Sequence, residues 1–189
     1  MHSIRQIVAL AGLTAAVACQ PADPEVVDPD TETAGFVANC LAGSRFDVQT
    51  WGAFETTINW VAADMECSGM RRPDDEGARL RFAGKLADSE RQIALILSIP
   101  DLVEGELADE LPTRVTVIEE DEGRFFSTQE ADICWTNITA QDALAEQESS
   151  YRIGGLLYCV SPIAELNGTA SVTLSDATFT GQLSWTTEP

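Results

Sequence analysis

The stretch that decides the fold reads ARLRFAGKL and covers residues 78–86. Leu80 and Phe82 lie on one side of an extended chain here, and Arg79 and Arg81 lie on the other side. Alternation of apolar and charged residues with a period of two is the pattern of a β-strand with one buried and one exposed face. The stretch therefore predicts a strand whose leucine and phenylalanine side chains contribute to a core.

Similar stretches on both sides of this strand predict an all-β domain. Apolar residues alternate with polar ones, and turn residues separate the stretches, at residues 93–99, 115–117, 123–128, 133–138, 151–160, 169–175 and 178–186. Residues 54–65 also approximate a helical stripe, but their β-branched residues favour a strand. We therefore expect residues 36–189 to form a single antiparallel β-sandwich of about eight or nine strands, stapled by disulfides.

Two acidic clusters, DDEG at residues 74–77 and EEDEG at residues 119–123, each lie between two predicted strands. Each cluster ends in glycine, which hairpin turns use for left-handed backbone conformations. Carboxylates could also bind calcium, but neither cluster has the alternating ligands and central glycine of an EF-hand loop. We interpret both clusters as turns, and we expect no metal site and no cofactor.

The last two predicted strands, residues 169–175 and 178–186, are expected to form a hairpin that turns at residues 176–177. With that turn, Leu174 lies opposite Phe179 on the core side of the pair. Threonine and serine then line the other face, as a half-exposed antiparallel sheet requires.

Residues 1–18 have the pattern of a secretory signal peptide. A short polar start is followed by an apolar run from Ile7 to Val17 and by a small-residue exit. The run is shorter than the roughly 20 apolar residues that a membrane-spanning helix needs. Ala16-Val17-Ala18 has the A-x-A form of an ordinary signal-peptidase site.

The pair Ala18-Cys19 resembles the end of a lipobox, the processing signal of bacterial lipoproteins. In that family an aliphatic residue and two small residues precede a cysteine that is acylated, and Ala16 stands here where leucine is usual. The resemblance implies that Cys19 is lipidated and anchors the protein to a membrane. It also implies the outer membrane of the bacterial cell envelope, because Gln20 is not the aspartate that favours inner-membrane retention in enteric bacteria. Ordinary signal-peptidase cleavage is the alternative.

The cysteines predict two disulfides. The chain has five cysteines, an odd number, and lipidation of one leaves an even set. Four cysteines allow three pairings. A hairpin that turns near residues 146–147 places Cys134 opposite Cys159, which leaves Cys40 to pair with Cys67.

Residues 19–35 begin with the cysteine of the lipobox and continue as an acidic segment rich in proline. Such a segment has too few apolar residues to form a core, so we expect a disordered tether. Proline-rich chains are extended, and the tether would hold the domain away from the membrane.

The charge and the histidine content exclude several classes of function. The chain carries 31 acidic and 11 basic residues, a net charge of -20. Such a charge repels the phosphates of nucleic acids, which are therefore not expected as partners. His2, the only histidine, lies in the predicted signal peptide. Its removal excludes Ser-His-Asp catalysis and zinc sites that use imidazole.

Trp51, Trp60 and Trp135 are the candidate ligand-binding residues. Aromatic rings on a β-sandwich can present stacking platforms for sugars, whereas packing in the core or on a sheet is the alternative for each ring. Trp185 shares a strand face with Phe179, so we expect it in the core.

Residues 151–185 are similar in strand spacing to small all-β envelope lipoproteins of bacteria. Cys159 lies in the first strand of this segment, and a Phe-x-Gly lies at residues 179–181. This resemblance covers a small part of the chain and implies no activity.

Catalysis without histidine would require carboxyl groups whose pKa values are raised by burial. No Asp or Glu lies on the core-facing side of the clearest predicted strands, and most acids lie in the tether or in turns. We therefore expect no catalytic residues and no enzyme. The predicted function is that of a membrane-anchored envelope lipoprotein with a non-catalytic binding or accessory domain, whose partner is an envelope protein or a glycan. A carbohydrate-binding module and a histidine-free glycoside hydrolase are the alternatives.

Overall fold

The computed structural model describes residues 40–73, 76–87, 89–128, 133–145 and 147–186, which all belong to one unit, Phe36–Pro189. The predicted signal peptide, Cys19 and the tether lie outside the described residues. The described part of the chain contains thirteen strands and no helix, and so no helix that could cross a membrane. The strands are β1 (Arg45–Gly52), β2 (Thr56–Val61), β3 (Met65–Arg71), β4 (Ala78–Lys85), β5 (Gln92–Ile99), β6 (Ala108–Pro112), β7 (Arg114–Glu119), β8 (Arg124–Ser127), β9 (Cys134–Ala143), β10 (Ser150–Cys159), β11 (Ile163–Ala164), β12 (Ser171–Leu174) and β13 (Ala177–Ser184).

The strands form one mixed sheet, in the order β11-β12-β1-β13-β3-β4-β5-β7-β8. β2 pairs with β1, and β10, β9 and β6 continue the sheet from β13. The sheet is mixed because β13 and β3 run parallel, at Ser184 and Met70. The all-β class is confirmed, whereas a sandwich of two antiparallel sheets is not confirmed, because the strands form a single curled sheet with more strands than expected.

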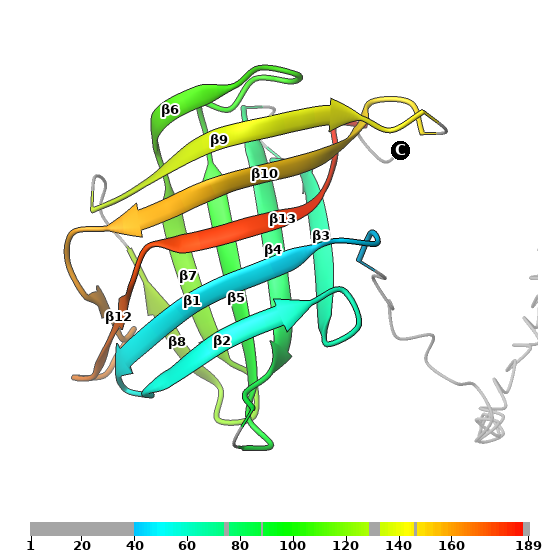
Figure 1. Ribbon diagram of the computed structural model, residues 1–189. Helices are drawn as coiled ribbons and strands as arrows, with labels where there is room; N and C mark the ends of the chain where they lie inside the picture. The colour runs from blue at the N-terminus through cyan, green and yellow to red at the C-terminus, as the bar shows by residue number, and fades with distance from the viewer. Residues whose placement is uncertain (1–39, 74–75, 88, 129–132, 146, 187–189) are drawn as a thin grey trace, which may run out of the picture. The chain divides into compact units, whose positions relative to one another are not determined.

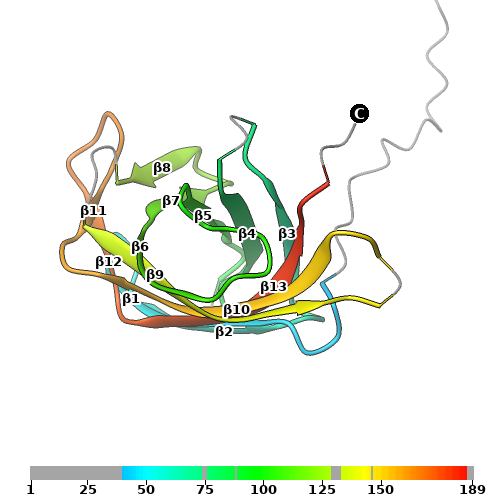
Figure 2. The ribbon, with the colours of Figure 1, turned by 90° about the horizontal axis from the view of Figure 1, so that it is seen from above.

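Figure 1 shows how the sheet is divided in space. β6, β9, β10, β13, β1 and β2 cross the view side by side, and β3, β4, β5, β7 and β8 run behind them in a crosswise direction. β13 joins the two groups, since it pairs with β10 and β1 in one group and with β3 in the other. From above, the sheet curls around a shared interior as a half-barrel (Figure 2).

Residues 78–85 of the stretch at residues 78–86 form β4, and the neighbours of β4 confirm the predicted core. Phe82 lies opposite Leu95 of β5, which in turn lies opposite Val117 of β7. These three side chains are buried, while Arg79 on the other face is exposed. The interior is closed around aromatic rings, with the ring of Phe82 4.9 Å from that of Phe46.

Residues 54–65 contain a strand and no helix. β2 pairs with β1 along its whole length, and the side chains of Ile58 and Trp60 alternate into the core. The β-branched residues of this segment therefore indicated its conformation correctly.

The predicted hairpin at residues 176–177 is wrong. β12 and β13 both pair with β1 in the same antiparallel direction, from Leu174 opposite Thr50 to Thr178 opposite Asp47. Ser175 exchanges hydrogen bonds with Gln49 between them, so the two strands form one bent strand with an extra residue. A bulge and a two-residue turn shift the alternation in the same way, and the sequence pattern alone cannot separate them.

Both predicted disulfides are confirmed. Cys134 of β9 lies directly opposite Cys159 of β10, and the two form a disulfide with a Cα–Cα distance of 4.0 Å. Cys40 forms the second disulfide with Cys67 of β3, with a Cα–Cα distance of 5.0 Å. The first bridge holds the β9–β10 hairpin together, and the second fixes the start of the described chain to β3.

Candidate functional site

Glu119, at the end of β7, is the feature that the sequence prediction missed. The acidic cluster at residues 119–123 was expected to lie in a turn, but Glu119 is only 1% exposed. Among the residues that the structure describes, it is the only buried Asp or Glu. Its position follows from β7 itself, because Val115, Val117 and Glu119 alternate onto the same inner face. Extending the alternation of Val115 and Val117 to the next inward position would have predicted that Glu119 is buried.

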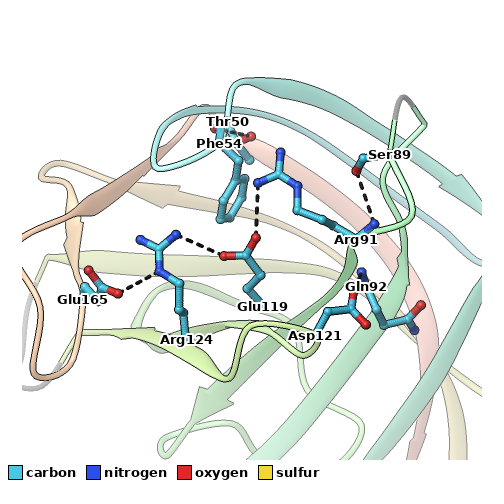
Figure 3. Close-up of polar contacts among 9 residues, drawn as sticks. All are labelled: Thr50, Phe54, Ser89, Arg91, Gln92, Glu119, Asp121, Arg124 and Glu165. Atoms are coloured by element: carbon cyan, nitrogen blue, oxygen red, sulfur yellow. Dashed lines mark hydrogen bonds and ion pairs between the residues drawn. The ribbon is translucent and has the colours of Figure 1, made fainter.

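Two arginines neutralise this buried carboxylate (Figure 3). Oε1 of Glu119 lies 3.2 Å from Nη1 of Arg91, which immediately precedes β5. Oε2 lies 3.2 Å from Nη1 of Arg124, at the start of β8. Nε of Arg124 donates in turn to Oε1 of Glu165 at 2.8 Å. We call Arg91, Glu119, Arg124 and Glu165 the Glu119 cluster.

The charges of the Glu119 cluster balance, with two guanidinium groups and two carboxylates. The hydrogen bond from Arg124 is the main reason why the pKa of Glu165 is lowered from its usual value, and the same bond raises the pKa of Arg124. The guanidinium of Arg124 also lies 5.1 Å from the centre of the Phe126 ring, a favourable cation–π distance. These contacts stabilise the charged groups of the Glu119 cluster in a partly buried site.

The Glu119 cluster lies where the last strand of the sheet order meets its first. Phe126 of β8 forms a β-bridge with Glu165, which follows β11. The amide of Leu166 donates to the carbonyl oxygen of Phe125 at 2.7 Å. Glu165 also accepts a hydrogen bond from the amide of Ala170. The cluster therefore ties β5, β7 and β8 to the β11–β12 segment.

The Glu119 cluster does not have the arrangement of a glycosidase carboxylate pair. Such enzymes need one carboxyl group that protonates a leaving group and a second that acts as base or nucleophile. Both oxygens of Glu119 are already bound by guanidinium groups, and Arg124 binds both Glu119 and Glu165. The contacts of these acids are those of structural ion pairs.

The three candidate tryptophans lie in different environments. Trp60 is buried, and its indole Nε1 donates to the carbonyl oxygen of Lys85 at 2.9 Å. Trp51 is 38% exposed on β1. Trp135 is half-buried and stacks on Tyr158 of the neighbouring strand, with ring centres 5.7 Å apart. The ring contacts of the described residues bring none of the three together, and Trp60 packs as a core residue.

Three hollows of the described surface are large enough for a small molecule. One of about 530 Å³ lies beside Trp185, which is buried as expected, and its lining includes Asp101 and Glu104. A second, of about 500 Å³, lies beside Trp60 and the β4–β5 connection. The third, of about 410 Å³, has a basic lining and lies on the outer face of the sheet. We call this third hollow the arginine groove and define it by Arg72, Arg79, Ser98, Arg114, Thr116 and Ser127.

The arginine groove is built by the register of β4, β5 and β7. Arg79 of β4 lies opposite Ser98 of β5, and Ser98 lies opposite Arg114 of β7. The small serine side chain between two arginines leaves the hollow. Arg79 was expected on an exposed strand face, but its alignment with Arg114 depends on strand pairing and was not predicted.

Metal binding finds no support in the described part of the chain. No group of three or more His, Cys, Asp or Glu side chains there could hold a metal ion. The acidic turns contribute no such group, although residues 74–75 lie outside the described residues.

Comparisons with known proteins add no further information about function. No protein-family model, no curated protein and no solved structure matches this chain.

Proposed function

We propose that this protein is a lipid-anchored protein of the bacterial cell envelope whose β-domain binds a partner and does not catalyse a reaction. The observation that carries the non-catalytic part is the state of Glu119. Both of its carboxylate oxygens are held by arginines, so the most buried acid of the described residues is engaged in structural ion pairs. A general acid or base must instead reach the proton that it transfers.

The location rests on Cys19 and on the disulfides. A diacylglyceryl group and an N-linked palmitate on Cys19 would together hold the protein stably at a membrane, and Gln20 favours the outer membrane. The two disulfides are in keeping with an oxidising compartment outside the cytoplasm. Nucleic acids are not proposed as partners, given the net charge of -20.

A substrate screen tests the proposed absence of catalysis. The purified protein is incubated with glycans, esters and peptides, in parallel with Glu119→Gln and Glu165→Gln. We expect no turnover by any of the three proteins. Turnover by the parent that is lost in either variant would contradict the proposal.

Labelling with radioactive palmitate tests the anchor. The wild-type protein should incorporate the label, and Cys19→Ser should be unlabelled and should appear in the soluble fraction or as an unprocessed precursor. A wild-type protein that stays unlabelled would show that the apolar N-terminus is an ordinary signal peptide.

A carbohydrate-binding module is the second candidate, and the Trp135–Tyr158 stack favours it. The two rings stack on neighbouring strands, with centres 5.7 Å apart and an interplanar angle of 25°, and together form a half-buried aromatic patch. Sugar rings stack on such surfaces, and β-sandwich binding modules use the faces of their sheets in this way. Trp135→Ala should abolish binding to an insoluble polysaccharide if this face binds glycans, and unchanged retention of the variant would exclude the face.

A further inference from the structure

Arg79 and Arg114 are unusual in an acidic protein because no acid of the described residues holds them. The chain has 31 acidic residues for 11 basic ones, so carboxylates are plentiful as partners for basic side chains. Ion pairs to Asp or Glu are formed by Arg45, Arg81, Lys85, Arg91 and Arg124. Arg152 donates to a backbone carbonyl oxygen instead. Among the described residues, no hydrogen bond or ion pair joins the side chain of Arg79 or Arg114 to an acid, and both line the same groove.

A neighbouring arginine on the same strand, Arg81, does pair with acids. Arg81 lies two residues from Arg79 and therefore points to the same outer face of β4. Its guanidinium contacts Glu66 at 3.1 Å and Glu120 at 2.7 Å. Arg81 is thus paired beside the arginine groove, whereas the described residues that line the groove include no Asp or Glu.

The spacing of the two arginines suits a single anion between them. Arg79 and Arg114 flank Ser98 in register on three adjacent strands. Adjacent strands lie about 4.8 Å apart, so the two backbone positions are roughly 9.6 Å apart. Arginine side chains are long enough to reach from both sides towards a group seated over the serine.

Three hydroxyl groups complete the lining. The hydroxyl of Ser98 has no hydrogen-bond partner among the described residues. Those of Thr116 and Ser127 lie 3.1 Å apart and bond to each other. One proton serves that bond, so the second hydroxyl still has a proton to donate. The groove therefore offers hydroxyl donors beside two guanidinium groups.

We propose that the arginine groove binds the phosphate group of a small phosphorylated compound. A phosphate has several oxygens that accept at once from guanidinium forks and hydroxyls, which matches the two arginines and three hydroxyls of the groove. The net charge of -20 repels long polyanions, which favours a small compound. A volume of about 410 Å³ has room for a sugar-sized remainder, and Ile96 offers it an apolar contact. Sugar phosphates and the glycerol phosphate of lipid headgroups share this chemistry.

Isothermal titration of the purified protein measures the affinity for four probes. These are inorganic phosphate, glucose 6-phosphate, glycerol 3-phosphate and uncharged glucose, all at constant ionic strength. The proposal predicts binding of the three phosphate compounds and none of glucose. Tighter binding of glucose 6-phosphate than of glycerol 3-phosphate identifies a sugar phosphate as the ligand class, and the reverse order identifies a lipid headgroup. Equal or tighter binding of glucose would overturn the proposal.

Two matched variants separate the groove from the overall charge. Arg114→Gln and Arg45→Gln each remove one positive charge, but Arg45 lies outside the groove and pairs with Asp47. Arg114→Gln should weaken phosphate binding about tenfold, the loss expected for one charge-assisted hydrogen bond. Arg45→Gln should change it less than about twofold. Equal losses in the two variants would contradict a local site, as would an unchanged affinity of Arg114→Gln.

This inference rests on the proposed non-catalytic function, and the same experiment separates the two. Release of inorganic phosphate from glucose 6-phosphate is measured in parallel. Absence of binding together with absence of release overturns the arginine groove and leaves the non-catalytic domain standing. Steady release by the parent protein would overturn both.

Discussion

The Glu119 cluster and the arginine groove lie on opposite faces of the same strands, and each contains a pair of arginines. On the inner face, Arg91 and Arg124 both contact the buried Glu119. On the outer face, Arg79 and Arg114 flank Ser98 and contact no acid among the described residues. An arginine that lies beside a buried carboxylate stabilises the fold. An arginine without such a neighbour can bind a ligand instead.

The reason for the difference is solvation. Removing the Glu119 carboxylate from water costs free energy unless opposite charges and hydrogen-bond donors replace the water. Exposed arginines carry no such cost, because water solvates them. Arg91 and Arg124 are therefore needed for the stability of the fold, whereas Arg79 and Arg114 are not.

The largest expected effect concerns the scaffold that holds both regions. Replacing Cys134 and Cys159 together by serine removes a bridge between residues 25 positions apart. Loop-closure entropy predicts a loss of about 3.5 kcal/mol in the free energy of unfolding. Urea unfolding measures this loss, and a variant that unfolds at the parent's midpoint would show that the bridge does not support the domain.

Loss of the inner carboxylate should be nearly as damaging. Glu119→Ala leaves Arg91 and Arg124 without their shared partner and should lower the free energy of unfolding by about 3 kcal/mol. Glu120→Ala is the matched control, because Glu120 is exposed and its ion pair with Arg81 is worth less than about 1 kcal/mol. Equal stability of the two variants in urea would mean that the buried Glu119 contributes no more to the free energy of unfolding than the exposed Glu120.

Acid should weaken the Glu119 cluster. The pKa of Glu165 is lowered from 4.5 in the folded protein, so its contribution to stability is present above pH 4.5 and is lost as the pH falls through the lowered value. Glu165→Gln should therefore show a shallower loss of thermal stability below pH 4.5 than the parent. Glu122→Gln, at an exposed turn position, is the control and should keep the parent's slope. A steep acid slope retained in Glu165→Gln would refute this role.

The smallest expected effect is on the outer face. Arg79→Gln together with Arg114→Gln should change the free energy of unfolding by less than about 0.5 kcal/mol, since neither residue is buried or holds an acid. Thermal unfolding in a buffer without phosphate measures this directly. A loss of stability comparable to that of Glu119→Ala would show that Arg79 and Arg114 stabilise the fold, and the difference between the inner and outer arginines would not hold.

Period-two alternation predicted which side of β4, β5, β7 and β13 faces the core, whereas β1, β3 and β6 were not predicted as strands. β4, β5 and the β7–β8 hairpin lie where the pattern placed them, because local hairpins pair strands that follow each other along the chain. The β9–β10 hairpin likewise brought Cys134 opposite Cys159, as its turn position implied.

The pattern could not predict neighbours that are distant in sequence. β13 pairs with β1 and runs parallel to β3, and these contacts curl the sheet instead of dividing it into two layers. Alternation fixes the face of a residue but carries no information about the adjacent strand. The row of Arg79, Ser98 and Arg114 follows from such pairing, and so it became visible only in the structure.

Glu119 was missed for a different reason. Its charge and its acidic neighbours Glu120 and Asp121 suggested a turn, although it continues the alternation of Val115 and Val117. Periodicity was the better guide there. The partners that make burial possible are Arg91, just before β5, and Arg124, at the start of β8, and neither could be inferred from the acidic cluster.

The most direct test of the contrast is the change in urea stability that glucose 6-phosphate causes in three proteins. These are the parent, Glu119→Gln, and the double variant Arg79→Gln/Arg114→Gln, each measured against glucose at equal ionic strength. At ten times the dissociation constant, a ligand that binds only the folded state adds about 1.4 kcal/mol to the free energy of unfolding. We expect this gain in the parent and in the less stable Glu119→Gln, and no gain in the double variant. A double variant stabilised as much as the parent would contradict the assignment of the outer arginines to a ligand.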